Sequence, residues 1–133
     1  MAEPNRDAST EADDLRQIMA LLADYCLTLD EGRFEDHLAL YDDSCRLHVF
    51  GKDFEGRERI DRFMRRAHRG KHLAGVPHIR LDGDTASSTS DFVFFRHDMQ
   101  LNSCGSYRDE FVRTPEGWRF CVRRIEIQLR AED

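Results

Sequence analysis

The stretch GSYRDEFVRTPEGWRF, residues 105–120, decides how this chain folds. Its first half, with Tyr107, Phe111 and Val112, belongs to a run that is typical of a strand. The segment Thr114-Pro115-Glu116-Gly117 then supplies a turn, and a second run rich in apolar residues begins at Trp118. The stretch therefore predicts antiparallel strands over residues 103–113 and 118–129, joined by a hairpin.

Further strands precede this hairpin. The turn Asp82-Gly83-Asp84 separates two predicted strands, residues 72–82 and 85–97. A shorter strand is predicted in CRLHVFG, residues 45–51, which alternates between apolar and polar residues like a strand with one buried face.

Helical patterns occupy the first half of the chain. Apolar residues at helical spacing predict a first helix, capped by Ser9 or Thr10 and ending at Asp30-Glu31-Gly32. Shorter helices are predicted over residues 34–41 and after Gly56. Three helices followed by hairpin strands predict an α+β fold. Residues 1–8 are predicted to be a loose tail, and residues 9–133 a single domain.

Composition narrows the class of protein. The 133 residues carry a formal net charge of -6, which disfavours binding to nucleic acid or to anionic membranes. No apolar run approaches the ~20 residues of a membrane helix, and the N-terminus has no signal-peptide pattern. The four cysteines show no metal or redox spacing. We therefore expect a cytoplasmic protein with free thiols.

Several predicted strands carry apolar residues at both odd and even positions, and therefore on both faces. Val93 and Phe95 alternate with Phe92 and Phe94, and the later strand has Ile125, Ile127 and Leu129 against Phe120 and Val122. A sheet that is apolar on both faces needs cover on both, and helices can cover only one. We therefore expect a homodimer or homotrimer that forms through the outer face of the sheet.

Four stretches carry a resemblance to a known superfamily: YCLTLDEGRFE (25–35), FEGRERI (54–60), HIRLDGDTA (78–86) and residues 105–120 quoted above. The chain resembles the nuclear-transport-factor-two-like superfamily, and within it the SnoaL-like proteins related to scytalone dehydratase and bile-acid dehydratase. The resemblance implies a cone-shaped, curved antiparallel sheet wrapped around three N-terminal helices, the cystatin-like half-barrel. It also implies an apolar pocket for a small hydrophobic molecule, with no cofactor and no metal.

The resemblance also implies site residues. Asp30 matches an aspartate that holds a catalytic histidine in these dehydratases, and His78 matches that histidine. Tyr25 matches a tyrosine of the bile-acid enzymes. Other family positions do not match, and the aspartate base that the steroid-isomerase relatives carry on the first strand is missing.

The dyad suits the chemistry of water elimination. One imidazole can remove the acidic C–H proton and then protonate the leaving hydroxyl, because its pKa lies near neutrality. A carboxylate on the other ring nitrogen would fix the tautomer. The alternative is that Asp30 is an ordinary polar residue at a helix end and His78 an ordinary strand residue.

Four more residues are candidates for contact with substrate: Tyr107, His48, Arg96 and Phe92. Tyr107 and Tyr25 could donate hydrogen bonds to a carbonyl or enolate, although both could equally be core aromatics. His48 could line the pocket or lie on a half-exposed strand. Arg96 stands at a strand end, where solvated surface is the commoner role.

The sequence gives little support for a metal site, a phosphate-binding site or hydrolase chemistry. His68 and His72 have the spacing of a helical metal pair, but Gly70 lies between them and no third ligand is nearby. No phosphate-binding glycine loop, serine-hydrolase elbow or zinc-peptidase motif is present.

The sequence therefore predicts a cofactor-independent dehydratase that acts on a hydrophobic polycyclic or aromatic hydroxy-ketone. Two alternatives stay open. The same pocket could serve a SnoaL-like isomerase or cyclase, or the chain could be a non-catalytic ligand-binding or assembly subunit.

Overall fold

The structure, a computed structural model, describes residues 8–131 and consists there of helices α1 to α3 and strands β1 to β7. Their bounds are α1 Ala8–Asp30, α2 Phe34–Leu38, β1 Tyr41–Val49, β2 Lys52–Glu55, α3 Arg57–Arg66, β3 Gly70–Ala74, β4 His78–Asp82, β5 Thr85–Arg96, β6 Leu101–Thr114 and β7 Gly117–Arg130. The expected tail, residues 1–8, lies outside the described residues except for Ala8, where α1 begins. In the described part of the chain, no helix has the length and apolar character needed to cross a bilayer.

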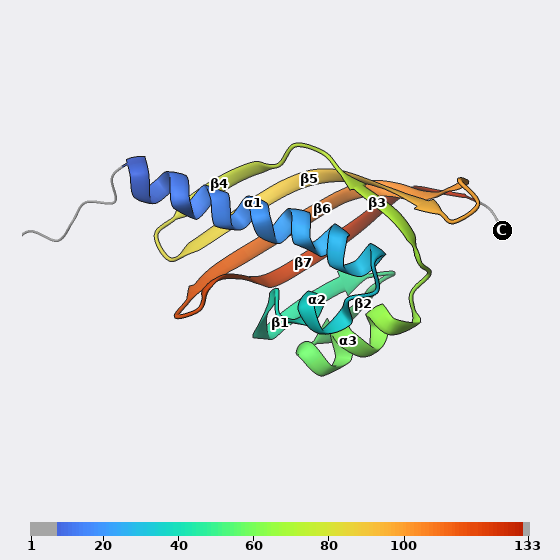
Figure 1. Ribbon diagram of the computed structural model, residues 1–133, viewed down its shortest axis with the longest axis horizontal. Helices are drawn as coiled ribbons and strands as arrows, with labels where there is room; N and C mark the ends of the chain where they lie inside the picture. The colour runs from blue at the N-terminus through green and yellow to red at the C-terminus, as the bar shows by residue number, and fades with distance from the viewer. Residues whose placement is uncertain (1–7, 132–133) are drawn as a thin grey trace, which may run out of the picture.

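The strands form one curved sheet in the order β2-β1-β7-β6-β5-β3, and β4 also pairs with β5. All pairs are antiparallel except β1 with β7, which are parallel. Helix α1 lies across one face of this sheet, and α2 and α3 lie beside β1 and β2 (Figure 1). The α+β fold with a curved, unclosed sheet is confirmed. The one parallel pair is an exception to the all-antiparallel sheet that the sequence predicted.

The predicted strand over residues 72–82 is in fact two strands. β3 pairs with residues 92–96 of β5, and β4 pairs with residues 85–89 of the same strand. Pro77 lies in the interruption between them and has no N–H to donate to a sheet. Because of this break, the alternation of side chains between the two faces of the sheet does not continue from β3 into β4.

The predicted strand over residues 45–51 is also different in extent. It begins earlier, at Tyr41, because helix α2 ends at Leu38 rather than at residue 41. It turns back at Phe50-Gly51, both with positive φ (55° and 71°), into β2. Such a two-residue turn suits a hairpin, although an aromatic residue is unusual in this backbone region.

The sequence predicted that the apolar residues of the last strand lie on opposite faces of the sheet, but a bulge in β7 changes this arrangement. Glu110 pairs with Val122, but the next residue, Phe111, pairs with Phe120, so β7 contains one extra residue here. An extra residue reverses the alternation of faces beyond it. Phe120 therefore shares the inner face with the later residues Ile125 and Ile127, which pack against the core.

The outer face keeps a smaller apolar area. The strand registers place Leu73, Val93, Cys104 and Leu129 opposite one another in a row across β3, β5, β6 and β7. Leu73 and Leu129 are 53% and 65% exposed. Assembly through this face stays a prediction.

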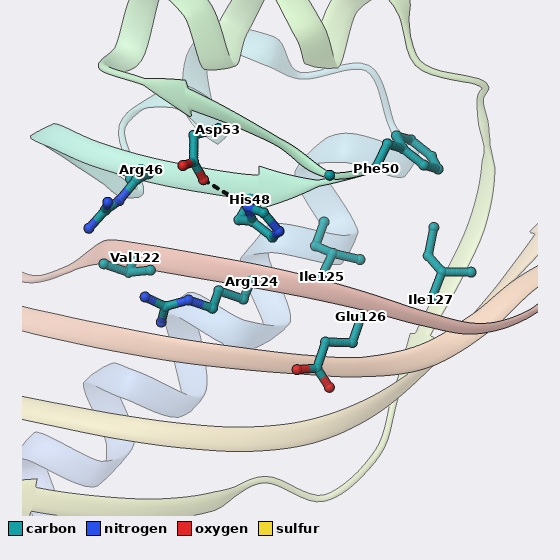
Figure 2. A pocket seen from close by; sticks show the side chains of 10 residues that line it. Arg46, His48, Phe50, Asp53, Val122, Arg124, Ile125, Glu126 and Ile127 are labelled. Carbon is teal, nitrogen blue, oxygen red and sulfur yellow. Dashed lines mark hydrogen bonds and ion pairs between the residues drawn. The ribbon is translucent and has the colours of Figure 1, made fainter.

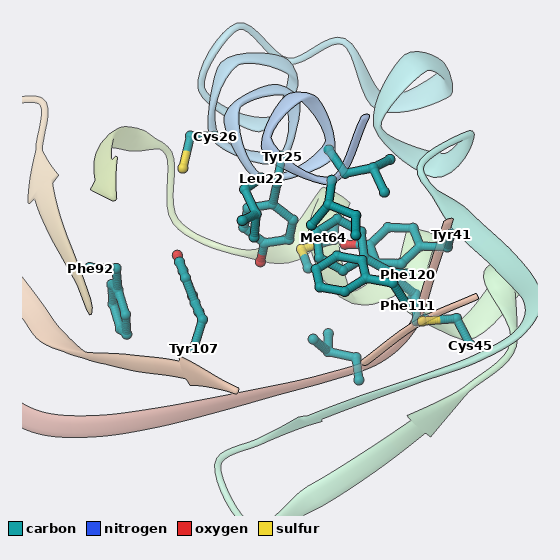
Figure 3. Packing of buried hydrophobic residues seen from close by; sticks show 14 of the residues in the cluster. Leu22, Tyr25, Cys26, Tyr41, Cys45, Met64, Phe92, Tyr107, Phe111 and Phe120 are labelled. Atoms are coloured by element: carbon teal, nitrogen blue, oxygen red, sulfur yellow. The ribbon is translucent and has the colours of Figure 1, made fainter. Parts of the chain in front are cut away.

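The core lies between α1 and the inner face of the sheet, and it is rich in aromatic rings (Figure 3). Phe111 and Phe120 pack with centroids 4.9 Å apart, and Phe120 also meets Tyr25 and Tyr41. Rings of this size bury much apolar area each and dominate the hydrophobic stabilisation of a small domain.

One buried histidine joins α1, α2 and β1. Thr28 Oγ1 and His37 Nδ1 lie 2.9 Å apart, and Tyr41 Oη and His37 Nε2 lie 2.8 Å apart. Thr28 Oγ1 donates its only proton to the Asp24 carbonyl, so Nδ1 carries the proton it donates and Nε2 accepts from Tyr41. Burial, with a contribution from Arg123, lowers the pKa of His37 to about 4. His37 is therefore a neutral structural residue at physiological pH.

A buried ion pair joins the neighbouring central strands β6 and β7. Arg123 of β7 lies opposite Asp109 of β6, with Nε 3.2 Å from Oδ1 and both side chains at most 1% exposed. The Arg123 guanidinium carbon lies 3.4 Å from the ring centroid of Tyr107 and 3.9 Å from that of Tyr25. These cation–π contacts and Asp109 compensate for the desolvation of the guanidinium.

We predict an acid-sensitive contribution from His37. Below pH 6.5 the unfolded chain binds a proton on this residue, whereas the folded chain does not until near pH 4. Stability is therefore lost as pH falls through this window, by up to about 3 kcal/mol at its lower end. Urea unfolding of wild type and His37→Gln at pH 7 and pH 4.5 measures it, with the exposed His97→Gln as control. Equal pH dependence in all three proteins would contradict the assignment.

We also predict that Asp109→Ala lowers the free energy of unfolding by about 3–5 kcal/mol, because it leaves a buried guanidinium without its carboxylate. The double variant Asp109→Leu/Arg123→Met removes both charges and should recover most of that loss. Urea denaturation at pH 7 gives both values. A double variant less stable than Asp109→Ala would show that the pair contributes net stability.

Candidate functional site

A cavity of about 340 Å³ opens between α1, α3 and the inner face of the sheet. Its deep wall includes the buried residues Tyr25 and Phe94 together with His72, and Ile125 and Ile127 line its sheet side. A cavity of this size with mostly apolar walls and a few polar groups has the character of a small-molecule site.

One residue of the cavity wall, His72, forms a buried pair with Asp30, which is not itself part of the wall. Asp30 is the last residue of α1 and His72 the middle residue of β3. The backbone N–H of His72 donates to Asp30 Oδ2 at 2.9 Å, and its Nδ1 lies 2.5 Å from Asp30 Oδ1. The side chains are only 7% and 12% exposed. Lys71 Nζ lies 3.7 Å from the same carboxylate.

This geometry fixes the histidine. Asp30 is an acceptor, so Nδ1 carries a proton and Nε2 is the basic nitrogen of the neutral ring. Within residues 8–131, Nε2 makes no hydrogen bond. Stacking on Phe94, with centroids 4.4 Å apart, holds the ring plane. The arrangement presents a basic nitrogen at the wall of the cavity.

The surroundings act on the pKa of His72 in opposite directions. Burial lowers the pKa and is the largest effect, whereas the hydrogen bond and charge of Asp30 raise it. Arg123 adds to the lowering. The net direction is downward, so the ring is neutral at physiological pH while Asp30 remains available to stabilise a transient imidazolium.

Tyr25 lies beside this pair and also lines the cavity. Its ring meets that of His72 edge-on, with centroids 6.4 Å apart. Burial raises the pKa of Tyr25 well above its usual value. Its hydroxyl therefore stays protonated and can act only as a hydrogen-bond donor or acceptor, not as an anion.

The structure does not form the expected pair of Asp30 with His78. His78 begins β4 and is exposed, and its register partner Thr89 is exposed as well. The residues that point inward from β4 are Ile79 and Leu81, which pack against the core. The alternation of this strand places His78 on the outer face, so the structure pairs Asp30 with His72 instead of His78.

Tyr107 and Phe92 are buried in the core and do not reach the cavity in which a substrate would bind. Their rings stack with centroids 4.5 Å apart, both side chains are buried, and neither is part of the cavity wall. Tyr107 also packs against Tyr25 and Arg123. In this structure the two residues support the wall behind Tyr25.

His48 lies on the other side of the sheet. It points into a separate hollow of about 520 Å³ on the outer face, between β1 and β7, beside Arg46 and Arg124 (Figure 2). Its Nδ1 lies 2.7 Å from Asp53 Oδ1, and both side chains are more than 40% exposed. This hollow is larger, but its His48–Asp53 pair is solvated, whereas the His72–Asp30 pair at the inner cavity is largely buried; we therefore take the inner cavity as the candidate site.

Arg96 also lies outside the inner cavity. It pairs with Asp98, at 2.8 Å between Nη2 and Oδ2, in the loop between β5 and β6. Together with His68, Arg69 and His97 it borders a surface hollow adjoining the cavity mouth. In the part of the chain that the structure describes, no cluster of three or more His, Cys, Asp or Glu side chains could hold a metal ion.

Sequence reasoning missed three features of the site. It treated His72 only as half of a metal pair with His68, although the pairing of His72 with Phe94 of β5 places it on the inner face. It did not identify the ion pair of Arg123 with Asp109. It also did not identify Arg66 and Arg130, which line the cavity.

Comparison with known proteins agrees with the fold. Residues 10–124 match the SnoaL-like domain family. An uncharacterized protein of Mycobacterium tuberculosis is 32% identical over 129 residues, covering 89% of this chain and 87% of the relative.

Two solved structures are similar in shape. A protein of unknown function from M. tuberculosis superposes with a TM-score of 0.82 at 24% identity, over 88% of this chain and 77% of the other. A provisionally assigned scytalone dehydratase from Novosphingobium aromaticivorans gives 0.79 at 19% identity, over 92% and 89% of the two chains. At these identities the likeness concerns the fold. With the family match covering most of its length, the chain belongs to the SnoaL-like domain family.

Proposed function

We propose that this chain is a cofactor-independent lyase that eliminates water from a hydrophobic hydroxy-ketone, with His72 as the acid/base. The observation that carries the proposal is the Asp30–His72 pair, which is buried and orients a basic nitrogen at the wall of an apolar cavity. The provisional scytalone dehydratase among the structural neighbours supports the reaction class through fold likeness alone.

The chemistry needs one base, one acid and a polarised carbonyl. His72 Nε2 takes the proton from the carbon beside the carbonyl, and the electron pair of that C–H bond forms an enolate. The Tyr25 hydroxyl donates a hydrogen bond to the developing oxyanion. The enolate then collapses, a carbon–carbon double bond forms, and the bond to the β-hydroxyl breaks. His72 returns its proton to that oxygen, so that water leaves.

Asp30 has a positioning role in this scheme. It accepts a hydrogen bond from Nδ1–H, with 2.5 Å between Nδ1 and Oδ1, and thereby keeps Nε2 in the basic form before the reaction. It also stabilises the positive charge on the ring after the first proton transfer. Its second oxygen is fixed by the backbone of β3, so the carboxylate cannot rotate away without losing that hydrogen bond.

A suitable assay uses 4-hydroxy-4-phenylbutan-2-one, an aromatic β-hydroxy-ketone whose dehydration gives a conjugated, ultraviolet-absorbing enone. We expect His72→Gln to lower kcat by about 10²–10⁴-fold, the usual contribution of an acid/base residue. His78→Gln is the matched control and should retain wild-type turnover, because it changes a histidine on the outer face. Thermal unfolding of both variants verifies that they are folded. Equal turnover by His72→Gln and wild type would refute the proposal.

The pH profile tests the role of Asp30. Turnover should rise with pH through the lowered pKa of His72 and then level off, because the neutral ring is the base. In Asp30→Asn the effect that raises this pKa is removed, so the rising limb should move to lower pH while the plateau falls. An unchanged limb would show that Asp30 does not act on His72 during turnover.

Product mass distinguishes the related reactions. Dehydration lowers the mass by one water, whereas isomerisation or cyclisation leaves it unchanged. In D₂O, uptake of deuterium beside the carbonyl without loss of water would show that His72 removes the proton but that the reaction ends as an isomerisation. Absence of both, over a range of hydroxy-ketones, would favour the non-catalytic alternative.

A further inference from the structure

The mouth of the inner cavity is cationic. Arg66 at the end of α3, His68 just after it and Arg130 at the end of β7 all line the cavity, and all three are exposed. The residues deeper inside, such as Tyr25 and Phe94, are buried. Among residues 8–131, no aspartate or glutamate is part of the wall. The cavity therefore runs from a positive rim to an apolar interior.

This positive rim is unusual for a chain with 26 acidic and 20 basic residues. On α3 the two neighbouring arginines are neutralised one turn back, Arg65 by Asp61 and Arg62 by Glu58. Arg66 has Arg62 at the equivalent position, four residues before it. Within residues 8–131, Arg66 has no carboxylate partner.

Arg130 is placed by a second irregularity of the sheet. Gly105 pairs with Ile127 but Cys104 with Leu129, so the register shifts by one residue, and Arg130 comes to lie opposite Ser103, which is buried on the inner face. Its guanidinium carbon lies 5.3 Å from the ring centroid of Phe50, another residue of the cavity wall. Arg130 likewise has no acidic partner among the described residues.

We propose that the molecule bound in this cavity is an aromatic or polycyclic carboxylate, whose anionic group is held at the rim by Arg66 and Arg130. Guanidinium groups bind carboxylates through paired, charge-assisted hydrogen bonds. The rings of the ligand would lie between Phe94 on one side and Ile125 and Ile127 on the other. This proposal rests on the proposed function only in assigning the same cavity, and it names the class of substrate.

The charge at the rim also determines which end of the ligand would stay at the mouth of the cavity. A carboxylate at the mouth keeps part of its hydration, so the desolvation cost is small, while the apolar body gains by burial. The opposite end of the ligand then points toward His72 and Tyr25, where the reacting carbonyl would have to lie. The rim therefore orients the substrate as well as attracting it.

The test compares two ligands of nearly equal shape, 2-naphthoate and its neutral analogue 2-naphthamide, by isothermal titration calorimetry at pH 7.5. We expect wild type to bind the carboxylate at least about tenfold more tightly than the amide, with a preference that declines as salt increases. In Arg66→Gln/Arg130→Gln the preference should disappear, while the affinity for the amide stays unchanged.

The control is Arg80→Gln. Arg80 is exposed on the outer face of β4, and like Arg66 it has no acidic partner in residues 8–131, but it does not line the cavity. This variant removes one positive charge and should keep the preference for the carboxylate. Loss of preference in Arg80→Gln would indicate a nonspecific effect of net charge and would overturn the proposal.

Two other results would also overturn it: equal binding of both ligands by wild type, or binding of neither. His72→Gln separates this proposal from the proposed function. It should bind 2-naphthoate with the full preference over the amide even when turnover is lost. If His72→Gln turns over hydroxy-ketones normally while the arginine variants lose the carboxylate preference, then the lyase mechanism fails and the ligand class stands.

Discussion

The two hydrogen bonds from His72 to Asp30 connect the first helix to the edge of the sheet. Asp30 is the last residue of α1, and its two carboxylate oxygens accept from the backbone and the ring of one residue in β3. A carboxylate is disfavoured at the C-terminal end of a helix, where the backbone dipole is negative. The two donors and the nearby Lys71 compensate for this cost. The position of α1 over the cavity and the orientation of the imidazole therefore depend on the same pair.

Local patterns in the sequence predicted most of the fold. The long first helix, the turn at residues 82–84 and the hairpin around residues 114–117 are all present, because each depends on neighbouring residues. The differences arise where long-range pairing decides. Nothing local distinguishes a strand that continues past Pro77 from one that stops, and the extra residue in β7 is defined only by its partner strand. Each such irregularity changes which residues face inward.

The residues of the site also divide into those that the sequence could identify and those that depend on long-range strand pairing. Tyr25 and Asp30 could be singled out because the resemblance to the SnoaL-like dehydratases matched them to site residues, and both lie on one predicted helix. Their histidine partner could not be derived from that helix. His72 and His78 are six residues apart and would share a face in one continuous strand, but they lie on opposite faces once the strand is broken between Ala74 and His78. The choice between them is a matter of sheet register rather than of composition.

The buried Arg123 influences the titration of the buried groups around it. Burial lowers the pKa of both His37 and His72, and Arg123, buried behind Tyr25, adds to the lowering, so that both rings are neutral at physiological pH. Burial of Asp109 raises its pKa to about 6, and Arg123 opposes that rise, which keeps the carboxylate ionised at neutral pH and the guanidinium compensated. The remaining cations of the cavity lie at its rim. In the proposed reaction, negative charge would build on a carbonyl oxygen beside Tyr25 and His72, so the fixed hydrogen bond from the Tyr25 hydroxyl would stabilise it without rearrangement. The rim arginines would thus hold the anionic group of the ligand, whereas the interior of the cavity would stabilise the enolate.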